Sequence, residues 1–151
     1  LGEGIGMKVI AWNRSGVPGD LAAEACELDD LMARADVVSL HLSLTDETAG
    51  LIDSRRIGLM RSHAILINTA RGGIIDETAL IEALQQSKIA HAGLDVFGEE
   101  PLPDDHPLLS LENVTLTAHS GFMTREASER LLRMALEIMR DELDDIAINS
   151  N

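Results

Sequence analysis

The chain has 151 residues, enough for one domain with a buried core, and its formal net charge of −14 comes from 12 basic and 26 acidic residues. This balance excludes the basic surface that nucleic acid or an anionic membrane demands, and the single cysteine, Cys26, excludes an internal disulfide. With no run near the roughly 20 apolar residues of a membrane helix and only 2% aromatic residues, we expect an acidic, soluble, cytoplasmic domain with an aliphatic core.

Strands and helices alternate along the predicted order of elements. Runs of β-forming residues predict strands over residues 7–12, 36–42, 64–68, 91–96 and 114–117. Helical spacing of apolar residues predicts helices over residues 28–35 and 54–60, a third after Asp76 and a long fourth after Thr124. Asp53, Asp76 and Thr124 are the predicted N-caps. Because several strands are apolar throughout, we predict an α/β fold, a doubly wound parallel sheet covered on both faces.

The chain opens with glycines at alternate positions, Gly2, Gly4 and Gly6. A dinucleotide fingerprint needs a strand that delivers such glycines to a helix N-terminus, where backbone N–H groups meet a pyrophosphate. Here a strand follows the glycines instead of preceding them. We therefore interpret residues 1–6 as a loop and the fingerprint as missing.

Polar residues gather where the predicted strands end, which is the edge at which open α/β sheets bind ligands. Considered singly, each has an ordinary interpretation as a loop arginine reaching water, a solvated carboxylate or a hydrogen-bonded strand-end histidine. The residues are Asn13 and Arg14, His41, the run from Asn68 to Arg71, Asp95, and the run from His119 to Gly121.

Three residues together form a chemical set. Arg71 offers a planar, always-charged fork that matches a carboxylate, and Gly72-Gly73 after it lets the backbone approach a ligand closely. The imidazole of His119 can donate or accept a proton, and a carboxylate such as Glu100 beside it would orient the ring. These are the parts needed to reduce a 2-oxo acid.

The charged, proline-rich loop over residues 98–107 has one further cue. Asp104-Asp105-His106 is a weak metal-binding pattern, and we interpret it as solvated loop. We predict no metal site.

Four segments make the chain resemble the D-isomer-specific 2-hydroxyacid dehydrogenase family, in its NAD-binding domain. They follow the family's order and spacing over residues 36–48, 66–76 with Asn-x-x-Arg-Gly, 92–101 with Gly-Leu-Asp-Val-Phe-x-x-Glu-Pro, and 116–121 around His119. The resemblance implies a Rossmann-like domain and hydride transfer between NAD(P)H and C2 of a small 2-oxo or D-2-hydroxy acid.

The resemblance also implies residue roles. Arg71 would hold the substrate carboxylate, His119 would be the acid in reduction and the base in oxidation, and Glu100 would pair with His119. Asp95 would hydrogen-bond the nicotinamide carboxamide. The implied cofactor contacts are Asn13, Arg14, Leu42, Ser43, Thr69, Ala70, Arg71, Asp95, His119 and Gly121.

The sequence departs from the family's pattern in small ways. Ala118 and Ser43 stand where proline is common, and we expect both to be tolerated. Asn13 stands where the family has an aspartate that binds the adenosine ribose, and Arg14 follows it. Because this pair does not repel a 2′-phosphate, NADP is a possible cofactor beside NAD.

A larger departure is the absence of the family's first strand, its Gly-rich loop and its substrate domain. We expect residues 1–151 to be a partial NAD(P)-binding domain, a fragment of a longer, homodimeric protein that is inactive in isolation. We predict a gap in the sheet between the strand over residues 7–12 and the strand over residues 64–68.

Two alternatives come from other functional classes. A non-catalytic NAD-sensing or interaction domain, like the family's corepressors, would keep similar residues. A phosphoacceptor receiver domain needs a lysine on a late strand, and the only lysines, Lys8 and Lys88, do not lie there.

Overall fold

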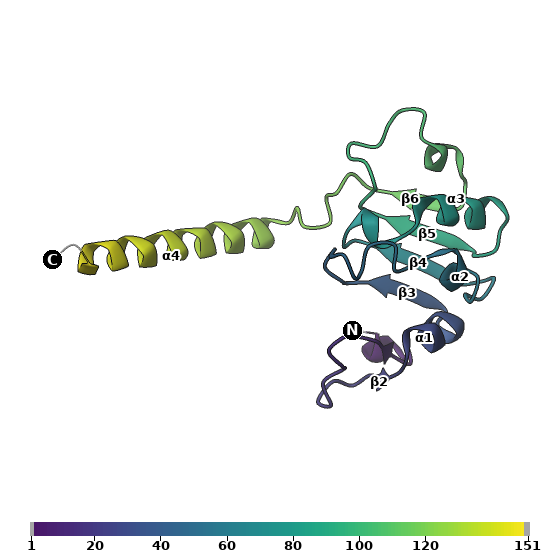
Figure 1. The fold of residues 1–151 in the computed structure, drawn as a ribbon, viewed down its shortest axis with the longest axis horizontal. Coiled ribbons are helices and arrows are strands. Elements are labelled where there is room, and N and C mark those ends of the chain that lie inside the picture. The colour runs from purple at the N-terminus through teal and green to yellow at the C-terminus, as the bar shows by residue number, and fades with distance from the viewer. Residues whose placement is uncertain (1, 150–151) are drawn as a thin grey trace. The chain divides into compact units, whose positions relative to one another are not determined.

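The computed structural model describes residues 2–149, and the chain forms two units, one up to residue 118 and one from residue 119 onward (Figure 1). The first unit holds the sheets, and the second holds a turn and one long helix. The elements are η1 (Glu3–Ile5), β1 (Ile10–Ala11), β2 (Glu24–Ala25), α1 (Leu28–Arg34), β3 (Val37–Leu40), α2 (Ser54–Ile57), β4 (Ile65–Asn68), η2 (Gly72–Ile74), α3 (Glu77–Gln85), β5 (His91–Leu94), η3 (Pro107–Ser110), β6 (Val114–Leu116) and α4 (Arg125–Asn149).

The main sheet is parallel, with the strand order β3-β4-β5-β6, and Figure 1 shows these strands side by side. Each strand pairs with the next along the chain, so that Leu66 of β4 lies opposite both Val38 of β3 and Ala92 of β5. This arrangement confirms the predicted parallel α/β fold. Its carboxyl edge therefore carries the residues that follow β3, β4, β5 and β6 in turn.

One face of the main sheet is buried in the first unit. In β4 and β5 every second residue is buried, including Leu66 and Ala92 at 0% exposure, while the residues between them are partly exposed. Leu80 and Leu84 of α3, also buried, belong to the same apolar cluster. The aliphatic core predicted from the composition therefore lies on one side of the sheet.

Two helices of the first unit begin at the predicted N-caps. The Asp53 carboxylate accepts the Arg56 N–H at the start of α2, and the Asp76 carboxylate accepts the Ala79 N–H at the start of α3. Each carboxylate satisfies a backbone donor that the first helical turn leaves without an intrahelical partner. These two caps are confirmed.

The glycine-rich start forms no cofactor-binding turn. Residues Glu3–Ile5 make a short 3₁₀ turn that ends at Gly6 in a left-handed conformation (φ 86°), and β1 comes after it. The interpretation of residues 1–6 as a connecting segment agrees with the described residues 2–6.

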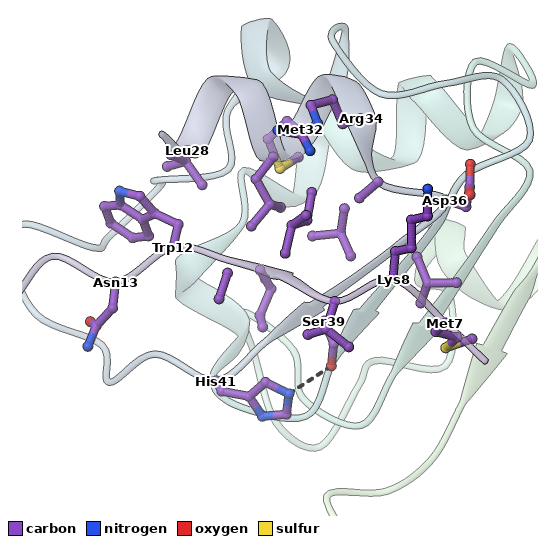
Figure 2. A pocket seen from close by; sticks show the side chains of 18 of the residues that line it. Met7, Lys8, Trp12, Asn13, Leu28, Met32, Arg34, Asp36, Ser39 and His41 are labelled. Carbon is purple, nitrogen blue, oxygen red and sulfur yellow. Dashed lines mark hydrogen bonds between the residues drawn. The ribbon is translucent and has the colours of Figure 1, made fainter. Parts of the chain in front are cut away.

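A second, two-stranded parallel sheet pairs β1 with β2, and a cavity of about 1110 Å³ separates β1 from β3 (Figure 2). Its lining comes mainly from residues 6–13, from α1 and from residues 35–42. The predicted position of this gap was wrong, because β4 is paired on both sides, with β3 and with β5. β2, Glu24–Ala25, contains no β-branched or aromatic residue and was not predicted. Each later strand was therefore counted one place too early, which misplaced the gap.

The second unit consists of the turn over residues 119–124 and α4. The Ala127 N–H donates to Thr124 Oγ1 at 3.1 Å, which confirms the predicted cap. Within residues 2–149, no helix combines the length and the apolar character needed to cross a bilayer. Seven large apolar side chains of α4 are more than half exposed: Leu131, Leu132, Met134, Leu136, Ile138, Met139 and Leu143.

Candidate active site

A pocket of about 610 Å³ opens at the carboxyl ends of β3 and β4. Five residues that the sequence placed in the site line it together: Leu42, Ser43, Thr69, Ala70 and Arg71. His41, which the sequence placed at this edge without a role, also lines it, and so does Leu44, which was not predicted. The structure therefore brings the predicted residues of two separate segments to one concave surface.

The loop that supplies Ser43 and Leu44 is closed by Thr48. Its hydroxyl donates to the Ser43 carbonyl at 2.6 Å and accepts the Thr45 N–H at 2.8 Å. Such side-chain to backbone bonds hold a turn that has no ladder partner. Thr48 is thus a supporting residue of the pocket that residue-type reasoning did not single out.

Arg71 is positioned by Asn68, the last residue of β4. The Asn68 side chain is 1% exposed, donates to the Arg71 carbonyl at 2.9 Å and accepts the Ala70 N–H at 3.0 Å. Both polar ends of the buried amide are therefore bonded to the turn that follows the strand. The Arg71 side chain is exposed and donates from Nη1 to the Ala70 carbonyl at 2.6 Å.

Gly72 is where the loop after β4 meets the loop after β5. A Cβ at this position would lie 2.0 Å from both the carbonyl carbon and oxygen of Phe97. The prediction that Gly72-Gly73 accommodates a ligand is therefore wrong for Gly72, which makes room for the Phe97 backbone. At Gly73 the nearest atom to an added Cβ is Leu44 Cδ2, at 3.1 Å.

Asp95, the residue after β5, is a buried carboxylate at 5% exposure. Thr117 Oγ1 donates to Asp95 Oδ1 at 2.5 Å, and the Asp95 N–H donates to the Asn68 carbonyl at 2.9 Å. Asp95 therefore joins the ends of β4, β5 and β6 at the same edge as the pocket.

Glu100 lies in the loop after β5, and its Oε1 accepts the Phe97 N–H at 2.9 Å. The interpretation of this loop as solvated was wrong for His106, whose side chain is only 16% exposed. Its Nε2 lies 3.2 Å from Oε1 of Glu77, a residue 29 positions away in sequence. No spacing in the sequence could have shown that contact.

Asn13 and Arg14 do not line the pocket of β3 and β4 but lie in a turn at the end of β1, and Asn13 lines the cavity between β1 and β3, which shares His41 and Leu42 with that pocket. The Gly16 N–H closes the turn on the Asn13 carbonyl at 2.9 Å, and the Asn13 side-chain amide donates to Ser15 Oγ at 3.2 Å. Arg14 forms an exposed ion pair with Glu47. Both cofactor roles remain predictions.

His119 and Gly121 belong to the second unit. His119 has a φ of 49°, in the left-handed region that side chains other than glycine adopt at a cost of roughly 1 kcal/mol. Its ring meets Phe122 edge-on, with the ring centroids 6.0 Å apart. Strained residues of this kind cluster at functional sites. The proton-transfer role of His119 and the cofactor role of Gly121 remain predictions.

Two carboxylates with lowered pKa values are Asp36, at the amino end of the sheet, and Asp29, on α1. A hydrogen bond from His63, followed in importance by one from Arg61, lowers the pKa of Asp36, which precedes β3. A hydrogen bond from Arg55 chiefly lowers the pKa of Asp29 on α1. These ion pairs connect structural elements: Asp29 joins α1 to α2, and Asp36 joins the start of β3 to residues 61–63. Among the described residues, no group of three His, Cys, Asp or Glu side chains could hold a metal ion.

Comparisons with known proteins agree with the fold. The sequence pattern of the D-isomer specific 2-hydroxyacid dehydrogenase NAD binding domain matches residues 1–121. A glyoxylate reductase of Aeropyrum pernix is 45% identical over 140 residues, which are 91% of this chain and 42% of that protein. The chain thus spans less than half the length of this relative.

Two solved structures show the same similarity with a cofactor bound. An acyclic imino acid reductase (Bsp5) in complex with NADPH and D-Arg superposes with a TM-score of 0.88 at 33% identity, covering 95% of this chain and 45% of that one. A D-lactate dehydrogenase from Lactobacillus jensenii with NAD⁺ gives a TM-score of 0.83 at 31% identity, covering 89% of this chain and 45% of that one.

Proposed function

The chain belongs to the D-isomer specific 2-hydroxyacid dehydrogenase family, and on that premise we propose that it is the NAD(P)-binding part of a 2-oxo acid reductase. The reaction is hydride transfer between NAD(P)H and C2 of a small 2-oxo or D-2-hydroxy acid. The observation that supports this most is the pocket at the ends of β3 and β4, with Arg71 on its wall. An acidic protein has no general field that attracts an anionic substrate, so a local cation is needed there.

The residues of the carboxyl edge suit a nicotinamide cofactor. Leu42 and Ala70 give the pocket apolar surface, and the buried Asp95 carboxylate can accept hydrogen bonds from a carboxamide. When bound, the cofactor supplies or accepts the hydride. Both NAD and NADP stay within the proposal, because Asn13 and Arg14 include no acidic side chain to oppose a 2′-phosphate.

Each proposed catalytic residue has a separate task. Arg71 binds the substrate carboxylate through its guanidinium fork and orients the adjacent carbonyl. His119 donates a proton to the carbonyl oxygen during reduction and removes it from the hydroxyl during oxidation. Glu100 pairs with the His119 imidazole and favours its protonated form. A homodimer of the full-length protein remains a prediction.

The test is oxidation of NADH and NADPH by the complete gene product with glyoxylate, hydroxypyruvate and pyruvate. We expect His119→Ala to lower kcat by a factor on the order of 10²–10⁴ while the cofactor dissociation constant stays within about threefold. Turnover unchanged in His119→Ala would exclude the assigned acid and base. Cofactor binding without turnover of any 2-oxo acid by the unsubstituted protein would instead favour a sensing domain.

A further inference from the structure

The loop after β5 is tied at both ends by one carboxylate. Glu77, the first residue of α3, accepts the Gly98 N–H at Oε2, at 3.2 Å. Its Oε1 lies 3.2 Å from His106 Nε2. Gly98 and His106 are the two ends of the segment over residues 98–106, so the two oxygens of a single side chain contact both ends of that segment.

The ring of His106 is itself held from both sides. Its Nδ1 accepts the Leu108 N–H at 3.3 Å, so the proton of the neutral ring lies on Nε2 and is donated to Glu77. Leu108 is fully buried, at 0% exposure. The end of the loop at His106 is therefore fixed to the core through Leu108 and to α3 through Glu77.

Glu100 lies in the same loop, and its position depends on the end of the loop at Gly98. The consecutive backbone N–H groups of Phe97 and Gly98 donate to two different carboxylates, Glu100 and Glu77. These N–H groups belong to adjacent peptide units that meet at the Phe97 Cα, so a backbone rotation at Phe97 that frees one bond disturbs the other. Gly72 packs directly on the Phe97 carbonyl, so the peptide unit that carries the Gly98 N–H also contacts the loop that carries Arg71.

We propose that Glu77 and His106 are positioning residues that hold the loop over residues 98–106 and thereby place the Glu100 carboxylate for catalysis. The inference rests on the proposed function, in which Glu100 pairs with the catalytic imidazole. Glu77 also lies in the first turn of α3, where a carboxylate interacts favourably with the helix dipole. That role alone would contribute to stability and would not change how the reaction responds to pH.

The test compares Glu77→Ala, Glu77→Gln and His106→Ala in the complete gene product, with Glu82→Ala as the matched control. Glu82 is an exposed carboxylate on the same helix. We expect Glu77→Ala to lower kcat for 2-oxo acid reduction about tenfold, with KM within about twofold, because misplaced groups slow the chemical step. Glu77→Gln keeps an acceptor for Gly98 and should recover part of the loss.

The pH–rate profile separates positioning from stability. A carboxylate held beside an imidazolium favours the protonated form, which is the proton donor in reduction. Loosening Glu100 should therefore move the falling limb of the profile to lower pH in Glu77→Ala and His106→Ala. A profile that coincides with that of the unsubstituted protein, or an equal kcat loss in Glu82→Ala, would overturn the proposal.

The contacts of Glu77 with Gly98 and His106 form a tether for the loop. Amide hydrogen exchange tests this tether and needs no catalytic activity. Glu77→Ala should raise the exchange rates of the Phe97 and Gly98 amides by about tenfold or more, while residues of β4 stay protected. Unchanged exchange at both amides contradicts the tether even if the enzyme is active. If no 2-oxo acid is turned over but exchange rises as expected, the proposed function fails and the tether stands.

Discussion

Replacing Gly72 by alanine is the sharpest test of how the two site loops fit together. The new Cβ would lie 2.0 Å from the Phe97 carbonyl carbon and oxygen and 2.6 Å from the Gly98 nitrogen, whereas ordinary contact begins at 3.4 Å. All three atoms belong to backbone, so no side chain can rotate away. The loops must therefore separate by roughly 1 Å or more.

The magnitude follows from that separation. Overpacking of a closely packed region costs about 1–3 kcal/mol of unfolding free energy. A displacement of about 1 Å at catalytic groups costs on the order of 10²-fold in rate. Because the moved loops carry Arg71 and Glu100, we expect both losses in Gly72→Ala.

The assays are urea unfolding of the 151-residue chain and steady-state reduction of glyoxylate by the complete gene product. Gly73→Ala is the matched control, because the atom nearest its added Cβ is the movable Cδ2 of Leu44, at 3.1 Å. We expect that variant to lose less than about 1 kcal/mol. If Gly72→Ala is as stable and as active as Gly73→Ala, the two loops do not pack as described.

Three further predictions test single contacts. Arg71→Lys keeps the charge but loses the bidentate fork, so kcat/KM for a 2-oxo acid should fall by about 10- to 100-fold, and an unchanged value would remove Arg71 as the anchor. Asp76→Ala loses the cap that accepts the Ala79 N–H at 3.1 Å and should lower the unfolding free energy by about 1 kcal/mol in urea titrations. Asp36 has a lowered pKa when folded, so its contribution to stability is present above its unfolded pKa and is lost as pH falls through the folded value. Asp36→Asn should therefore be less stable than the unsubstituted chain at neutral pH and equally stable in strong acid; a difference that persists in acid would contradict this.

The carboxyl-edge pocket could be predicted because two simple rules determine it. The apolar run before Asn68 is long enough to be a buried strand, and the carboxyl ends of parallel strands share one edge. Residues that follow β3 and β4 therefore meet, whatever the details of packing. The predicted strands were longer than the observed ones, because the run of β-forming residues continues past the last hydrogen-bonded pair, as at Leu42 after β3 and Val96 after β5.

The features that were not predicted depend on contacts between distant residues. Glu24–Ala25 forms a strand only because β1 lies beside it, since its own sequence has no β preference. The bond between Glu77 and His106 joins residues 29 positions apart and leaves no local pattern. The role of Gly72 likewise depends on Phe97, which arrives from the next strand.

The cavity between β1 and β3 has a consequence for how copies of the chain behave in solution. In the described part of the chain, each of these strands is hydrogen-bonded to a neighbour on one side only, so the opposite edge of each presents main-chain donors and acceptors. Edges of this kind recruit strands from other molecules and promote aggregation. The net charge of −14 opposes such encounters by repulsion between copies. At 0.1 M salt this repulsion is largely screened at separations beyond about 10 Å. The acidic composition therefore protects an open sheet, and self-association should increase as ionic strength rises.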